Sequence, residues 1–292
     1  MRKETVIYSD GIPVSAYVFI PDMEEGEAPA VILCHGHSRD KSDGLEPLAE
    51  RLCENGFVVV AADFRGCGSR AENKYHLYCT SEWPRDLINT IYYTQQLSFV
   101  DAERIGVAGI SMGAATAVYV AGMDKRIRSA AVMAGIADCE SWLEEVWKNN
   151  HGDWDAFKRK IAEDKERAVI TGSSRLVPTL EMYHSPQQEQ QELKEEGFFN
   201  EGINAFLSLD SIENLLWYKP VEKCAGIYAP IFFIHGGNDT LVAPENSKKM
   251  YAAVPSEKKK IKIYGGMGHN IPCEPDCERV FEDIAEWFLE TL

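Results

Sequence analysis

Uninterrupted hydrophobic runs recur along the chain, with segments of helical periodicity between them. The runs in the first half are 30–36 (AVILCHG), 57–66 (FVVVAADFRG), 105–110 (IGVAGI) and 128–138 (RSAAVMAGIAD). Strand-like segments return at 229–239 (APIFFIHGGND) and 259–266 (KKIKIYGG). Runs without polar alternation are typical of strands buried on both faces of a parallel sheet. Residues 14–20 (VSAYVFI) alternate, which predicts a half-exposed strand.

The segments between these strands predict helices. Residues 44–56, 81–97 and 112–123 place apolar side chains at helical intervals. In the last segment, 276–292, the residues on one helical face are Val280, Ile284, Trp287 and Phe288. Strands that alternate with helices in this way predict an α/β protein with a doubly wound, mostly parallel sheet.

The alternation stops between residues 139 and 227. This segment contains helical, aromatic-rich stretches and a polar run, SPQQEQQELKEEG, but no strand of the preceding kind. Structureless loops of such length are rare within compact domains. The sequence therefore predicts a helical cap at 139–227, inserted into a core formed by residues 1–138 and 228–292.

A candidate nucleophile lies where one predicted strand gives way to a helix. Ser111 stands in a G-x-S-x-G pattern between Gly109 and Gly113. A serine at a sharp strand-to-helix turn needs small residues two positions away on either side, and this arrangement is a nucleophile elbow. The pattern also arises by chance in loops, so its interpretation depends on finding a base and an acid.

The ends of two later strands supply a candidate acid and a candidate base. Asp239 ends the run at 229–239, and His269 lies in the loop after 259–266. The carboxyl ends of parallel strands meet at one edge of a sheet, and the order Ser, Asp, His is the one expected for a nucleophile-elbow enzyme. Asp138 is a second candidate for the acid, although its position also suits a helix N-cap. We favour Asp239, and we interpret His235 as a packed core histidine.

Two backbone N–H groups are expected to stabilise an oxyanion: those of Met112, directly after the nucleophile, and of His37, after the strand at 30–36. The side chains of His35 and His37 suggest a metal site as an alternative, but no carboxylate or third histidine stands beside them. Cys273 and Cys277 likewise lack a second ligand pair. The sequence predicts neither a metal nor a cofactor, and Arg65 in DFRGCGS is expected in a structural ion pair.

Taken together, the segments HGHS, DFRGCGS, GISMG, HGGND and GMGH resemble the α/β-hydrolase superfamily from about Thr5 to the end of the chain. Within it, the chain looks similar to the branch of dienelactone hydrolases, cinnamoyl esterases and prolyl-oligopeptidase-like enzymes. The resemblance implies a cofactor-free serine hydrolase that acts through an acyl-enzyme. The cap is longer than in the small esterases of that branch.

The favoured activity is cleavage of small to medium apolar or aryl-acyl esters. The same apparatus could serve an aminopeptidase or amidase, a thioesterase or a C–C hydrolase, and a non-catalytic ligand-binding protein on this fold is a further alternative. Ligand sites are mainly apolar, so large cap side chains are candidates for substrate binding. They are Trp142, Trp147, Trp217 and Tyr218.

The composition narrows the choice of partners. The chain has 292 residues, of which 45% are hydrophobic, and a formal net charge of −16. Such a charge opposes binding to nucleic acid and to anionic membrane surfaces. No apolar stretch is long enough for a membrane span, and the eight dispersed cysteines suit a reducing compartment. We expect a cytoplasmic enzyme of a small-molecule substrate, as a monomer or a homo-oligomer.

Overall fold

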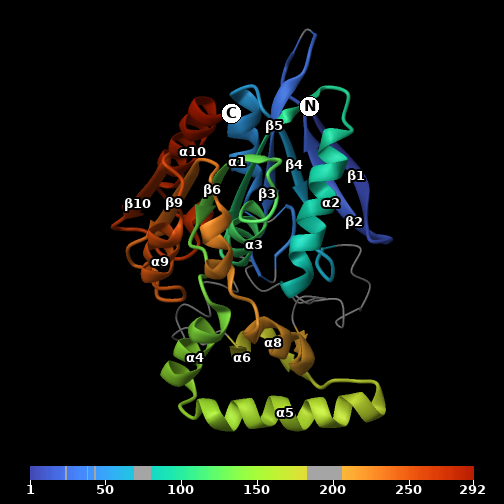
Figure 1. Cartoon of the computed structure of the whole chain (residues 1–292), viewed down its shortest axis with the longest axis vertical. Coiled ribbons are helices and arrows are strands. Elements are labelled where there is room, and N and C mark those ends of the chain that lie inside the picture. Colours follow the sequence, from blue (N-terminus) through green and yellow to red (C-terminus); the bar gives the residue numbers. More distant parts are fainter. Residues whose placement is uncertain (24, 38, 43, 69–79, 183–205) are drawn as a thin grey trace.

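The structure is a computed structural model that describes residues 1–292 except 24, 38, 43, 69–79 and 183–205 (Figure 1). Ser38 of the HGHS segment, Ser69 of the DFRGCGS segment and part of the predicted cap therefore lie outside the described residues.

An eight-stranded sheet forms the centre of the molecule, in the order β1-β2-β4-β3-β5-β6-β9-β10. Its strands are β1 (Arg2–Ser9), β2 (Ile12–Phe19), β3 (Ala28–Cys34), β4 (Val58–Ala62), β5 (Val100–Ile110), β6 (Ile127–Met133), β9 (Ile231–Gly236) and β10 (Lys259–Tyr264). From β4 to β10 every neighbouring pair is parallel, whereas β1 and β2 pair antiparallel at one edge. The predicted mostly parallel sheet is confirmed.

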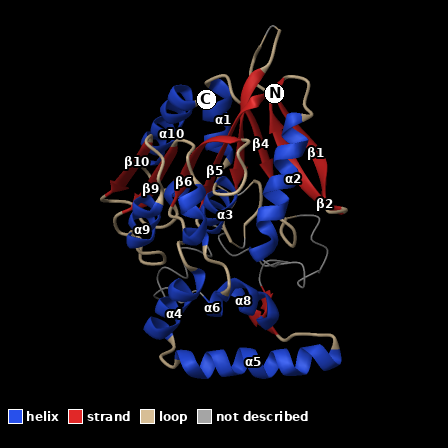
Figure 2. Ribbon diagram, in the orientation of Figure 1, coloured by secondary structure: helices blue, strands red, loops and turns tan. Residues whose placement is uncertain are grey.

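Helices cover both faces of the sheet (Figure 2). On one face pack α1 (Glu46–Glu54) and α10 (Cys277–Thr291), and on the other α2 (Trp83–Gln95), α3 (Met112–Ala121) and α9 (Glu245–Ala253). Neighbouring residues of a strand point to opposite faces, so Ile32 packs with the second group and Leu33 with the first. None of the described helices is long and apolar enough to cross a membrane.

Strand β1 is absent from the predicted elements. It forms a hairpin with β2 through Asp10 and Gly11, whose φ angles are both positive, at 51° and 82°. Two consecutive positive φ angles are the signature of the tight turn that Asp-Gly favours, so this dipeptide was the available signal. The strand is hard to predict because half of its side chains lie exposed at the sheet edge, which leaves little hydrophobic pattern.

The described part of the segment between β6 and β9, which is predicted as a cap, lies next to the sheet (Figure 1). It contains α4 (Cys139–Asn150), α5 (Trp154–Thr171), β7 (Leu176–Pro178), α6 (Thr179–Met182), β8 (Phe206–Ser208) and α8 (Leu209–Leu216). The short antiparallel pair of β7 and β8 was not predicted, because three-residue strands leave no recognisable periodicity. The chain returns to the core through the 3₁₀ helix η4 (Pro220–Gly226), which packs against α3.

Arg65 ties three segments of the core together. Its Nε and Nη2 atoms donate to Asp86 Oδ1 on α2 at 2.9 and 2.8 Å. Further ion pairs reach Asp10 of the hairpin turn at 2.9 Å and Glu82 at 3.0 Å. The predicted structural ion pair is thus present, and it fixes the loop after β4 against the hairpin and the start of α2.

Candidate active site

The turn from β5 into α3 holds Ser111 in a strained backbone conformation. Its φ and ψ angles are 55° and −120°, a region that costs a non-glycine residue on the order of 1–3 kcal/mol. A Cβ atom at Gly113 would lie 2.2 Å from the Cys34 carbonyl oxygen, and one at Gly109 would lie 2.7 Å from the Gly113 backbone. Close approach of backbone to backbone therefore explains both glycines of the G-x-S-x-G pattern.

His269 lies between Ser111 and Asp239 and contacts both. Its Nε2 atom is 3.0 Å from Ser111 Oγ, and its Nδ1 atom is 2.7 Å from Asp239 Oδ2. An ionised carboxylate only accepts hydrogen bonds, so Nδ1 carries the hydrogen and donates it to Asp239. The Nε2 lone pair then faces the Ser111 hydroxyl, in the geometry that lets an imidazole remove a proton.

The Asp239 carboxylate is buried, and both of its oxygens accept hydrogen bonds. Its Oδ1 atom accepts the backbone N–H groups of Leu241 and Val242 at 3.0 and 2.8 Å. Burial alone would raise its pKa, but the attraction of His269 and the hydrogen bonds from His235, His269 and Val242 lower the pKa below the usual range. Asp239 is consequently held as an anion.

Asp138, the alternative acid, lies in a different environment. Its side chain accepts the Ser141 N–H at 3.0 Å and so caps α4. The Lys219 ammonium lies 3.6 Å from its other oxygen. The carboxylate in contact with His269 is therefore that of Asp239, as favoured from the sequence.

His235 is buried, as predicted, but it does more than fill the core. Its Nε2 atom lies 3.1 Å from Asp239 Oδ2, so two histidines share one carboxylate oxygen. The contact between His235 and Asp239 is not predicted from the sequence. The available signal was the position of His235 at the end of a buried strand, four residues before Asp239.

The two predicted oxyanion donors belong to segments next to the nucleophile. Met112 is the first residue of α3, where backbone N–H groups have no acceptor within the helix. His37 follows β3, and the preceding Gly36 passes so close that a Cβ atom there would lie 3.6 Å from Ser111 Cβ. The loop after β3 is thus positioned beside the nucleophile.

The side chains of His35 and His37 pack inside the protein. His35 donates from Nδ1 to the Gly36 carbonyl oxygen at 2.8 Å and accepts the Phe64 N–H at Nε2 at 3.0 Å. Burial lowers the pKa of His35 to about 4 and that of His37 to about 3. Both rings are therefore uncharged at neutral pH, and both nitrogens of His35 are already bonded. No group of three or more metal-ligating side chains gathers among the described residues.

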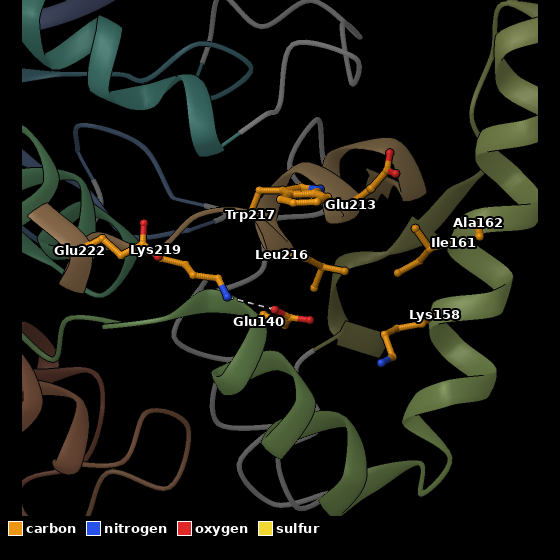
Figure 3. Close-up of a pocket in the computed structure, with 9 residues that line it drawn as sticks. All are labelled: Glu140, Lys158, Ile161, Ala162, Glu213, Leu216, Trp217, Lys219 and Glu222. Atoms are coloured by element: carbon orange, nitrogen blue, oxygen red, sulfur yellow. Dashed lines mark hydrogen bonds and ion pairs between the residues drawn. The ribbon is translucent and has the colours of Figure 1, made fainter.

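The four cap aromatics lie in different surroundings. Trp217 is 80% exposed and lines a cavity of about 500 Å³ between α4, α5 and α8, together with Leu216 and Ile161 (Figure 3). The residues that line this cavity do not include Ser111 or His269.

The other three aromatics make contacts within the protein. Trp142 is buried and donates from Nε1 to the Leu241 carbonyl oxygen at 2.8 Å. The ring of Trp147 stacks on Phe157, with centroids 3.6 Å apart. Tyr218 is buried, and its ring stacks on Tyr119 of α3. These contacts favour packing roles for Trp142, Trp147 and Tyr218 over the predicted contact with substrate.

The hydrogen bond of Trp142 joins the cap to the loop that carries Asp239. We expect Trp142→Phe to lower the free energy of unfolding by about 1–2 kcal/mol, because the Leu241 carbonyl loses its donor while most apolar area is retained. Urea unfolding measures the change. Trp147→Phe is the matched control, since an aromatic ring remains in the stack on Phe157. Equal destabilisation by both substitutions would contradict the role assigned to the hydrogen bond.

Comparison with known families identifies the fold. Residues 27–276 match the family described as serine aminopeptidase, S33. The chain belongs to this family. The S33 assignment confirms the predicted membership of the α/β-hydrolase superfamily, and an enzyme of the hydrolase class follows from it.

Relatives of this S33 hydrolase align along most of its length. An uncharacterized 31.7 kDa protein of Escherichia coli is 25% identical over 90% of this chain and 91% of its own. A carboxylesterase of Bacillus subtilis is 23% identical over 92% and 95% of the two chains. A monoacylglycerol lipase of Mycolicibacterium smegmatis is 23% identical over 97% and 95%.

Solved structures show the same fold at low sequence identity. The S33 hydrolase superposes on DcsB, solved with a substrate analogue, with a TM-score of 0.85 at 18% identity and full coverage of both chains. Est1E of Butyrivibrio proteoclasticus, solved with ferulic acid, gives a TM-score of 0.70 at 18% identity over 98% of each chain.

Proposed function

We propose that this protein is a serine hydrolase that cleaves carboxylic esters through an acyl-enzyme. The observation that carries the proposal is the continuous set of contacts from Asp239 through His269 to Ser111, at 2.7 and 3.0 Å. A serine in this arrangement is activated by an adjacent base, and the base is oriented by an anion.

In the proposed reaction, Ser111 Oγ attacks the ester carbonyl carbon while its proton passes to His269 Nε2. The N–H groups of Met112 and His37 stabilise the negative oxygen of the tetrahedral intermediate. The C–O bond to the alcohol then breaks, and the leaving oxygen takes the proton from His269. Water attacks the acyl-enzyme by the same route, with His269 again accepting a proton and returning it to Ser111 Oγ. Asp239 stabilises the imidazolium in both halves.

We propose small to medium apolar or aryl-acyl esters as the substrate class. Support comes from relatives named as a carboxylesterase and a monoacylglycerol lipase, and from a structural neighbour that holds ferulic acid. The family description, serine aminopeptidase, favours a second candidate, cleavage of an amide next to a free amine. That activity needs carboxylates that bind the substrate's ammonium group, in addition to the triad.

A fluorophosphonate probe and a substrate panel test the proposal. The probe should label the protein at Ser111, and the panel should show hydrolysis of p-nitrophenyl esters at rates far above those of aminoacyl p-nitroanilides. Acetate, butyrate, octanoate and an aryl-acyl ester define the acyl preference. Efficient cleavage of the anilides with slow cleavage of every ester would favour the aminopeptidase, and absence of labelling would overturn the serine mechanism.

A further inference from the structure

A buried hydrogen-bonded cluster adjoins the Asp239 carboxylate. Its centre is His235, on β9, whose side chain is fully buried. The His235 Nε2 atom lies 2.8 Å from the Val242 carbonyl oxygen and 3.1 Å from Asp239 Oδ2. The Nδ1 atom lies 2.7 Å from Oγ of Ser247, a buried residue of α9.

The partners of His235 determine where its hydrogen lies. The Val242 carbonyl and the Asp239 carboxylate both only accept, so Nε2 must carry a hydrogen that these two oxygens share. The other ring nitrogen, Nδ1, is hydrogen-bonded to the Ser247 hydroxyl. Ser247 and Val242 thereby hold the ring from opposite sides with its Nε2–H directed at Asp239.

This arrangement completes the restraint of the carboxylate. Backbone N–H groups of Leu241 and Val242 hold Oδ1, and His235 holds Oδ2, the same oxygen that accepts the His269 hydrogen. Without the donor from His235, His269 is the side-chain partner that Oδ2 keeps among the described residues. Small rotations of the carboxylate would then carry over to the imidazole, and catalytic geometry tolerates displacements of only about 0.5 Å.

We propose that His235 is a positioning residue, which fixes the Asp239 carboxylate in the orientation that accepts the His269 Nδ1–H. Ser247 acts one step further away by fixing the ring of His235. The inference rests on the proposed triad and extends it to five side chains in one hydrogen-bonded chain. If His235 had a purely structural role, its substitution would lower the amount of folded protein and leave kcat per folded molecule unchanged. A positioning role instead predicts a lower kcat.

Two substitutions at one position separate these roles. His235→Gln places an amide N–H close to the former Nε2 and keeps a donor toward Asp239, whereas His235→Asn has its amide near the former Nδ1 and loses that donor. We expect His235→Asn to lower kcat about 10–100-fold with KM within about threefold, the size of effect that a small misplacement produces. His235→Gln should restore kcat to within about fivefold of the wild type.

Ser247→Ala provides a milder variant if the substitutions at His235 impair folding. It removes one oxygen and leaves His235 in place, and we expect a loss in kcat of about 3–10-fold, consistent with the loss of one orienting hydrogen bond. The proton resonance of the His269 Nδ1–H, followed by NMR, should be unchanged in His235→Gln and displaced in His235→Asn and Ser247→Ala.

The outcomes distinguish this inference from the proposed function. Equal kcat for His235→Gln and His235→Asn, or an unchanged resonance and kcat in Ser247→Ala, would overturn the positioning role. If the fluorophosphonate probe still labels wild-type Ser111, either of these results leaves the proposed serine mechanism unaffected. If the wild type itself does not react with the probe, the proposed function fails first, and the inference fails with it.

Discussion

Replacement of Ser111 by alanine should lower kcat for ester hydrolysis by about a millionfold, the loss found when a serine hydrolase loses its nucleophile. His269 would keep its bond to Asp239, but no oxygen would stand 3.0 Å from Nε2 to attack the ester. Initial rates on p-nitrophenyl butyrate measure the loss. The fluorophosphonate probe should no longer label the protein.

We expect Ser111→Ala to remain folded, because the hydrogen bonds of residue 111 to the adjoining helix and strand involve backbone atoms. Ser111 contacts helix α3 and strand β6 through backbone atoms, since it accepts the Ala115 N–H at 2.9 Å and donates to the Met133 carbonyl at 2.8 Å. Alanine retains both bonds, so the unfolding temperature should stay within a few degrees of the wild type, corresponding to less than about 1 kcal/mol. More than a few per cent of wild-type activity in Ser111→Ala would refute the assignment of the nucleophile.

Replacement of Asp239 by asparagine should lower kcat by about 10⁴-fold, as the equivalent change does in a serine protease. The Oδ1 site faces two backbone N–H groups and requires an oxygen, so the asparagine amide nitrogen must occupy the Oδ2 site. There it donates hydrogens toward His269 Nδ1, which favours the tautomer that carries its hydrogen on Nε2. That tautomer cannot accept the proton of Ser111.

Asp138→Asn is the matched control for this substitution. Asparagine caps helices about as well as aspartate, so the bond to the Ser141 N–H is retained and stability should change by only a few tenths of a kcal/mol. Turnover should remain within about twofold of the wild type. A larger loss in Asp138→Asn than in Asp239→Asn would place the acid on the earlier strand.

The central strands are predictable because a strand buried on both faces of the sheet appears in the sequence as an uninterrupted hydrophobic run. The run at 57–66 became β4, all of whose side chains are buried, and the helix predicted at 276–292 became α10 with Val280 and Ile284 in the core. The pattern fails where burial is partial or the element is short. Edge strand β1 and the pair of β7 and β8 belong to that group.

The three side chains of the proposed triad could be selected from the sequence for a related reason. The carboxyl ends of parallel strands lie at one edge of the sheet, so Ser111, Asp239 and His269, in the turn and loops that follow β5, β9 and β10, were expected to meet. The glycines around Ser111 carried further information, because their spacing reflects the clash that any Cβ would make with backbone atoms.

Local sequence patterns were sufficient to predict the parallel strands of the sheet, the order of the proposed nucleophile, acid and base, and the presence of a long insertion. Only the packed molecule shows that His235 contacts Asp239 and is held by Ser247, that Trp142 bonds the Leu241 carbonyl, and that Trp217 is exposed. Periodicity along a chain reports which side of an element is buried, but not what lies opposite that side. Those contacts depend on the order in which β6, β9 and β10 pair and on where α4 and α9 pack, which no local pattern encodes.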